Sequence, residues 1–214
     1  MSKIASALTL SFAAISSVPA QAGIVNFTSP VVANAGVVGV GRPNASFVEE
    51  AGEGRFTFGS EIFDAFCFEV YQGSVFPTDY TKIANWADGS QKRQLVGRLF
   101  AQYYATYKND RIGTSAMQST LWEIIEDTAD LNFTKGRFFF DTGTDTAVSA
   151  LAGVMLASVI AGTNSNDYSF NLFLSPDSQD LIQVVKNAAT VPLPGSAALL
   201  GLGLIGFLGL RRQY

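Results

Sequence analysis

The spacing of apolar residues predicts three helices in the second half of the chain. Over residues 94–107, apolar or aromatic side chains recur every three or four positions, which places them on one helix face. The same spacing predicts a second helix over 116–126, with Thr114 or Ser115 as its N-cap. A third helix is predicted over 146–160.

Strands are predicted where apolar residues alternate or run together. The stretch FDAFCFEVYQG, residues 63–73, alternates with the period of a strand. One face of this strand would carry Phe66, Phe68 and Val70, and the other Cys67, Glu69 and Tyr71. Shorter apolar runs predict further strands at 136–141, 168–174 and 180–185.

The order of these elements favours an α+β fold, because the helices are grouped between runs of strands and do not alternate with them. Residues 24–60 are rich in Gly, Val and Ser, with breaks at Pro30, Gly36 and Pro43, and predict irregular strands and loops. We expect a β-sheet or sandwich core with a cluster of about three helices, followed by a hydrophobic helix at the carboxyl end.

The first 22 residues have the layout of a secretory signal peptide. Lys3 precedes an apolar stretch over 4–15, and the triplet Ala20-Gln21-Ala22 has small residues on either side of Gln21. Signal peptidase is expected to cut after Ala22; the alternative is an N-terminal core helix. The exported part is then one domain spanning residues 23–190, long enough for a sizeable core.

An uncharged run over residues 196–210 predicts a short membrane span. A helix of that length covers about 22 Å, against a hydrocarbon core of ~30 Å. Arg211 and Arg212 would hold its end at the cytoplasmic face of the inner membrane and leave the main domain outside. The alternative is a hydrophobic hairpin packed into the domain.

The carboxyl end resembles a known sorting signal. Val191, Pro192 and Pro194 precede the Gly- and Leu-rich run, which the two arginines close. This order resembles the PEP-CTERM signal of Gram-negative bacteria, over residues 191–214. The resemblance implies that the inner membrane holds the protein until an exosortase cuts near the prolines, and that the protein then moves to the cell surface or extracellular matrix. Leu193 stands where that family usually has Glu, which bears on the efficiency of processing.

The amino-acid composition excludes several functions that depend on charge or on histidine. The chain has 14 Lys and Arg against 18 Asp and Glu, so its net charge of −4 gives no reason to bind nucleic acid. It contains no histidine, which excludes Ser-His-Asp and Cys-His catalysis and removes the commonest zinc ligand. We expect no metal, no cofactor and no enzymatic activity.

The single cysteine, Cys67, cannot form a disulfide within the chain. Gln118 and Trp122 are four residues apart and share one face of the second predicted helix. Together with Phe66-Cys67-Phe68, they resemble the thioester domains of bacterial surface adhesins, over residues 63–127. In that family an aromatic-Cys motif on a strand meets a Gln-x-x-aliphatic-Trp motif on a helix, and the Cys sulfur displaces ammonia from the Gln side chain.

The resemblance implies an internal thioester between Cys67 and Gln118, with Phe66 and Trp122 excluding water. A thioester is an activated acyl group because the thiolate leaves easily. An amine or a hydroxyl of a surface or matrix partner would open it. In the alternative interpretation, Cys67 is a small buried residue, Gln118 is a solvated helix residue and Trp122 belongs to the core.

Other polar clusters are weaker candidates. Glu123, Glu126 and Asp127 form an acidic helix end, and paired carboxylates serve glycosidases, but a solvated face is the simpler interpretation. The stretches DTGTD (141–145) and TNSND (163–167) lack the spacing of a calcium loop and are typical of turns.

The leading hypothesis is therefore an exported surface or matrix protein that acts as an attachment module through a Cys67–Gln118 thioester. The second is a non-catalytic structural protein of an exopolysaccharide-associated matrix, with the same fold and no thioester. A hydrolase comes third, because no acid–base pair is convincing.

Overall fold

The computed structural model describes residues 20–33, 35–42 and 45–188. The predicted sorting segment, 191–214, lies outside these residues, as does the signal peptide before Ala20. The described elements are, in order, β1 (Gln21–Pro30), β2 (Val37–Arg42), β3 (Ala45–Glu50), β4 (Gly54–Phe58), β5 (Glu61–Cys67), β6 (Thr78–Ile83), α1 (Gln91–Tyr107), α2 (Arg111–Asp127), β7 (Phe139–Phe140), α3 (Thr146–Ala161), β8 (Tyr168–Leu174) and β9 (Leu181–Lys186).

Six antiparallel strands close into a barrel in the order β1-β4-β5-β9-β8-β6. Alternate residues of each strand point inward, and aromatic rings fill the interior. Phe63 stacks on Phe173 with ring centroids 4.2 Å apart, and Phe58 meets Phe173 edge-on at 5.4 Å. The α+β class is confirmed, and its β core is this closed barrel.

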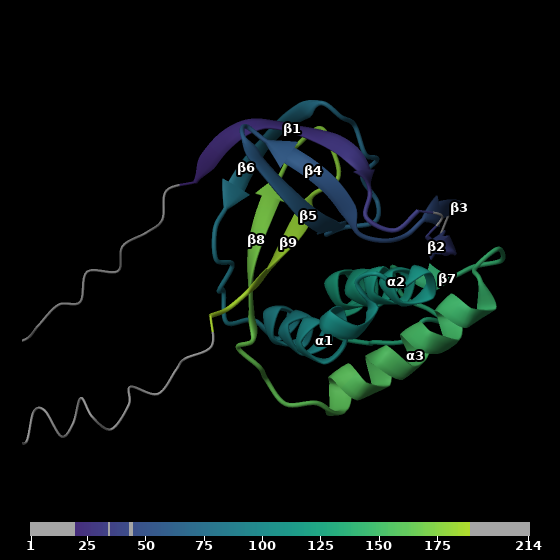
Figure 1. The fold of residues 1–214 in the computed structure, drawn as a ribbon. Helices are drawn as coiled ribbons and strands as arrows, with labels where there is room; N and C mark the ends of the chain where they lie inside the picture. Colours follow the sequence, from purple (N-terminus) through teal and green to yellow (C-terminus); the bar gives the residue numbers. More distant parts are fainter. Residues whose placement is uncertain (1–19, 34, 43–44, 189–214) are drawn as a thin grey trace, which may run out of the picture.

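The helices and a small sheet, ordered β3-β2-β7, lie together against one end of the barrel (Figure 1). Helix α2 is at the centre of this layer, in contact with α1, α3 and β2. Every residue from Gly113 to Ile125 is buried. Phe66 of β5 packs on Phe100 of α1, with ring centroids 5.4 Å apart, and so joins the barrel to the helices.

Helix α2 begins five residues earlier than predicted. Asp110 is its N-cap, and the Asp110 side chain accepts a hydrogen bond from the Gly113 N–H at 2.6 Å. Thr114 and Ser115, which were predicted as N-caps, lie inside the helix. Their hydroxyl groups form hydrogen bonds with the backbone of other segments. The Ser115 hydroxyl accepts from the Gly36 N–H and donates to the Ala51 carbonyl, at 2.7 and 2.5 Å. Helix α1 also starts earlier than predicted, and α3 is confirmed.

The strands and loops predicted over residues 24–60 are present as β1 to β4 and their connections, and the β1–β4 register shifts between Phe27 and Ser29. Two other strand predictions need correction. Strand β5 ends at Cys67, so the alternation does not continue as a strand to residue 73. Within residues 136–141, only Phe139 and Phe140 pair with another strand, β2. The backbone N–H groups of residues 137 and 138 donate instead to the Asp127 carboxylate. The strands at 168–174 and 180–185 are confirmed, the latter one residue later.

Two predictions concern the ends of the chain. Strand β1 begins at Gln21, so cleavage after Ala22 would remove its first two residues, which pair with Lys82 and Thr81. No helix among residues 20–33, 35–42 and 45–188 is long and apolar enough to cross a membrane. The hydrophobic helix predicted over 196–210 lies outside the described residues.

Two carboxyl groups are buried in the core. Glu123 is 0% exposed, which corrects the prediction of a solvated acidic helix end, and its Oε1 accepts from the Asn132 N–H at 2.6 Å. Burial raises the pKa of Glu123 to about 8. Glu53, just before β4, is 3% exposed, and burial raises its pKa to about 7.

We expect the protein to be more stable at pH 5 than at pH 8. Both glutamates ionise near pH 4.5 when unfolded but hold their protons to about 7 and 8 when folded. The folded state therefore binds more protons between these values, and the free energy of unfolding falls as pH rises. Melting temperatures from circular dichroism measure this fall. In Glu123→Gln the melting temperature should change less with pH above pH 7. Equal melting temperatures of the unchanged protein at pH 5 and pH 8 would contradict the raised pKa values of the two glutamates.

Candidate functional site

The site forms where strand β5 extends beyond the end of its neighbour β4. The β4–β5 ladder ends with Gly54 opposite Ala65, two residues before Cys67. On the other side, β5 remains paired with β9, and the Phe68 N–H donates to the Asp180 carbonyl at 2.7 Å. In an antiparallel ladder, successive residues direct their backbone groups to opposite sides. The N–H and C=O of Cys67 therefore face the side on which β4 has ended.

The side chain of Gln118, from helix α2, takes the place of the missing strand. The Cys67 N–H donates to Gln118 Oε1 at 3.0 Å, and Gln118 Nε2 donates to the Cys67 carbonyl oxygen at 2.7 Å. This reciprocal pair uses one donor and one acceptor of each residue. Gln118 is 0% exposed, so the interpretation of it as a solvated helix residue is wrong.

The two hydrogen bonds hold the amide group against the residue that bears the thiol. Because hydrogen bonds to a carbonyl lie near its plane, they close a ring in which the amide carbon Cδ faces Cys67 Cα. The Cβ–Sγ branch leaves Cα out of that plane, and a nucleophile attacks a carbonyl carbon from outside its plane. The arrangement thus brings together Cys67 and Gln118, as the sequence motifs predicted.

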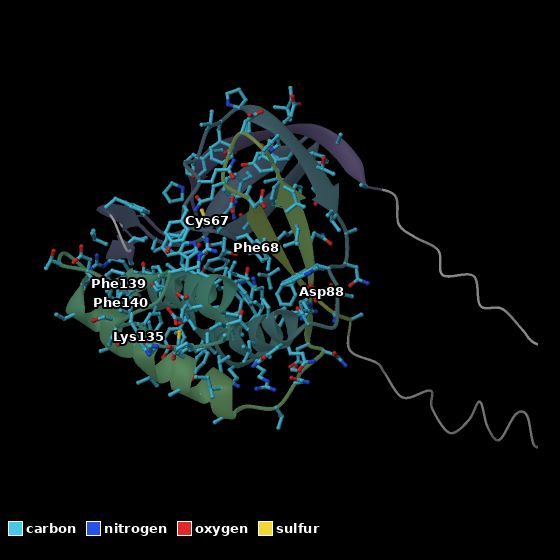
Figure 2. All side chains as sticks on the ribbon, turned by 180° about the vertical axis from the view of Figure 1, so that it is seen from behind. Cys67, Phe68, Asp88, Lys135, Phe139 and Phe140 are labelled. Atoms are coloured by element: carbon cyan, nitrogen blue, oxygen red, sulfur yellow. The ribbon has the colours of Figure 1, made fainter. Side chains whose placement is uncertain are left out.

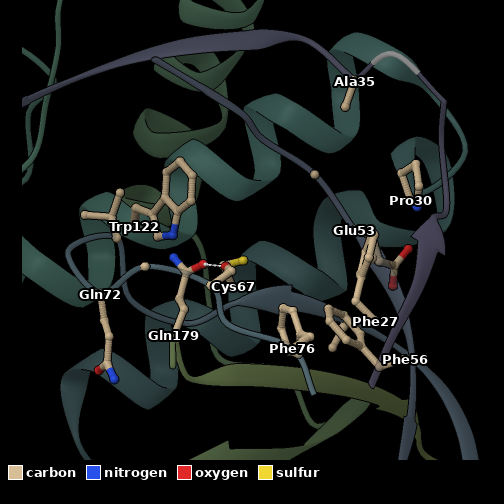
Figure 3. Close-up of a pocket in the computed structure, with 16 residues that line it drawn as sticks. Phe27, Pro30, Ala35, Glu53, Phe56, Cys67, Gln72, Phe76, Trp122 and Gln179 are labelled. Carbon is tan, nitrogen blue, oxygen red and sulfur yellow. Dashed lines mark hydrogen bonds between the residues drawn. The ribbon is translucent and has the colours of Figure 1, made fainter. Parts of the chain in front are cut away.

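A pocket of about 520 Å³ lies beside Cys67 (Figure 3). Its buried wall includes Phe56, Val70, Trp122 and Gln179, and exposed residues such as Phe27, Pro30 and Ser74 form its rim. Figure 2 shows Cys67 at the boundary between the barrel and the helical layer. The pocket is therefore the route by which an external molecule can approach the half-buried thiol.

Trp122 contributes an unsatisfied donor to this wall. Its side chain is 3% exposed, and its indole N–H has no hydrogen-bond partner within the described part of the chain. Figure 3 draws the indole nitrogen on the side of the ring toward Cys67. Leaving a buried N–H unbonded costs about 1–3 kcal/mol, so this group is poised to bind an oxygen atom in the pocket.

Glu53 and Gln179 are pocket residues that sequence reasoning missed. The Tyr104 hydroxyl donates to Glu53 Oε1 at 2.6 Å, which offsets part of the pKa increase that burial causes. Gln179 accepts from the Ser74 hydroxyl at 2.9 Å and donates to the Glu69 carbonyl. An acidic residue between two glycines, Gly52 and Gly54, was the only hint of Glu53 in the sequence.

The remaining predicted site residues fall in different places. Trp122 lines the pocket, as expected, whereas Phe66 packs away from it against Phe100 and Tyr104, so it does not shield the pocket. Ala20 and Ala22 are exposed at the start of the barrel. The sorting-signal residues lie outside the described residues: Val191, Pro192, Pro194, Arg211 and Arg212.

Comparisons with known proteins support the sorting signal directly. Residues 190–213 match the model of the PEP-CTERM protein-sorting motif, which confirms the predicted signal. No curated protein sequence matches the chain.

Two solved structures are similar in outline. The N-terminal domain of the Streptococcus pyogenes pilus tip adhesin Cpa is 17% identical, with a TM-score of 0.42, and the match covers 75% of this chain and 98% of that one. The N-terminal thioester domain of a Clostridium perfringens surface protein is 14% identical, with a TM-score of 0.41, covering 77% and 100%.

We expect the Gln118 amide to stabilise the fold even where no covalent bond forms. In a Cys67→Ala background no thioester can exist, yet the backbone groups of residue 67 remain. Adding Gln118→Ala leaves that N–H and carbonyl without partners and should cost about 2–4 kcal/mol in the free energy of unfolding. Urea denaturation measures the difference. Gln91→Ala, at an exposed position in the first turn of α1, is the control and should change stability by less than about 0.5 kcal/mol. An equally small effect of Gln118→Ala would show that the pair is not formed.

Proposed function

We propose that this protein is an exported surface attachment module that carries an internal thioester between Cys67 and Gln118. The observation that supports it most is the pair of hydrogen bonds that joins the Gln118 amide to the Cys67 backbone. The PEP-CTERM motif supports export and cell-surface sorting. The pocket beside Cys67 supplies access for a partner molecule.

Thioester formation would begin with attack of Cys67 Sγ on Gln118 Cδ. Negative charge then develops on Oε1, where the Cys67 N–H already donates, so that the transition state is stabilised by a donor held in position. The Cδ–Nε2 bond breaks, the thiol proton passes to the leaving nitrogen, and ammonia departs. The products are one thioester and one ammonia, with no oxidant or metal required.

Opening of the thioester would attach the protein to its partner. A nucleophile in the pocket attacks Cδ, the C–S bond breaks, and the proton of the nucleophile passes to Cys67 sulfur. The new bond is an amide or an ester at the Gln118 side chain, and it consumes the activated group. The protein is thus a single-use reagent and not an enzyme.

The second candidate is a structural matrix protein of the same fold. The same hydrogen bonds favour it, because Gln118 satisfies two backbone groups at a strand end that would otherwise be buried without partners. In that case the amide stays intact and Cys67 is never acylated. The two candidates differ by the mass of one ammonia.

We expect the freshly purified mature protein to be lighter than its sequence mass by one ammonia. Methylamine should add covalently to the Gln118 side chain, which peptide mapping can locate, and should leave Cys67 open to alkylation. Cys67→Ala should abolish both effects with a modest loss of stability, because a smaller side chain replaces a half-buried one. Gln179, a buried glutamine that lines the pocket, is the internal control and should gain no methylamine. Full sequence mass with an alkylatable Cys67 in unheated protein would leave only the structural candidate.

We further expect an exosortase to remove the carboxyl-terminal segment in a host that has one. Mass spectrometry of the surface or secreted protein should then find no peptide containing Arg211 and Arg212. Replacing both arginines with Glu should impair retention before cleavage, because the cationic end at the cytoplasmic face is lost. Leu193→Glu should raise the cleaved fraction. Protein that keeps both arginines would identify the segment as a permanent anchor.

A further inference from the structure

One wall of the pocket beside Cys67 is a continuous aromatic surface. The rings of Phe27, Phe56 and Phe76 contact one another, with centroid separations of 5.5 Å (Phe27–Phe56), 6.1 Å (Phe27–Phe76) and 5.4 Å (Phe56–Phe76). Phe27 is 47% exposed, which is unusual for so large an apolar side chain at a concave site. Such a wall binds a flat or ring-shaped ligand through its apolar face.

The rest of the lining offers neutral hydrogen-bonding groups. The Trp122 indole N–H is buried without a partner and requires an oxygen acceptor. Gln72 is half-buried and Ser74 is exposed; the Gln72 amide N–H donates to the Ser175 carbonyl and the Ser74 hydroxyl to Gln179, so their oxygen atoms remain as acceptors. These groups are suited to hydroxyl oxygens, which both donate and accept.

The charges of the pocket select against ionic ligands. Among its described lining residues there is no lysine or arginine, so an anion finds no counter-charge. Glu53 is the one carboxyl group among these described lining residues, and its Oε1 already accepts from the Tyr104 hydroxyl. Burial raises the pKa of Glu53 to about 7, so near neutral pH this carboxyl is a weak attractor for an ammonium group.

We propose that the pocket receives a neutral sugar ring, stacked on the aromatic wall, and that a sugar hydroxyl is the nucleophile that opens the thioester. The ring's C–H face packs on the phenylalanines, and one ring oxygen accepts from the Trp122 indole N–H. This inference rests on the proposed thioester. In the step, the hydroxyl oxygen bonds to Gln118 Cδ, the C–S bond breaks, and the hydroxyl proton passes to Cys67 sulfur. The product is an ester to the sugar, with the thiol restored.

The test uses the full mature chain and three probes: methyl glucopyranoside, glycerol and methylamine. Intact mass should show addition of the glucoside to the ammonia-depleted protein, and glycerol, which has hydroxyls but no ring, should add more slowly. Trp122→Phe keeps an aromatic ring at this position but replaces the indole with a smaller phenyl group, which removes the N–H. In this variant the rate of glucoside addition divided by the rate of methylamine addition should fall roughly tenfold.

Trp86→Phe is the matched control, since Trp86 is the only other tryptophan and its indole N–H donates to Asp88, away from the pocket. It should leave all three rates unchanged. A protein that adds methylamine but no glucoside, or a Trp122→Phe variant in which the ratio of the two rates equals that of the unchanged chain, would overturn the inference.

Failure of the thioester itself has a separate signature. If the unchanged protein keeps its full sequence mass, the proposed function and the ester step are both wrong. Sugar recognition is then decided in Cys67→Ala by titration with methyl glucopyranoside, followed through the indole N–H resonance. A shift of that resonance on Trp122, absent in Trp122→Phe, supports the pocket assignment, and no shift overturns it.

Discussion

The burial of helix α2 on all sides is the constraint on which the rest of the structure depends. Polar groups in such a helix must find partners inside the protein, because water does not reach them. Thr114 binds the backbone of Glu53, Ser115 binds Gly36 and Ala51, and Gln118 binds Cys67. Through these bonds one helix fixes the loop before β2, the start of β4 and the end of β5.

The same requirement explains how a structural contact can become a reactive one. Gln118 satisfies two backbone groups that β4 leaves uncovered, and in doing so it holds its amide carbon near a residue with a thiol side chain. For the proposed thioester, preorganisation of this kind would lower the entropic cost of reaction, because the amide is already held beside Cys67. Without that reaction the contact serves stability alone.

The difference in length between β4 and β5 also creates the pocket. Where β4 has not yet begun, Gly52 and Glu53 leave space between the barrel mouth and α2, and Trp122 of that helix lines the gap. The indole N–H is buried on the side of the ring toward Cys67 (Figure 3) and has no hydrogen-bond partner among the described residues.

The sequence alone determined the features that rest on local periodicity and composition. These are the three helices, the strands at 168–174 and 180–185, the α+β class, the sorting motif and the exclusion of histidine chemistry. It also singled out Cys67, Gln118 and Trp122, since i and i+4 residues share a helix face. Only the tertiary structure decided that the sheet closes into a barrel, that Asp110 caps α2 and that Phe66 faces away from the pocket. Likewise, Glu53 joins the pocket only through the fold, because strand register and helix burial are set by contacts between residues far apart in the chain.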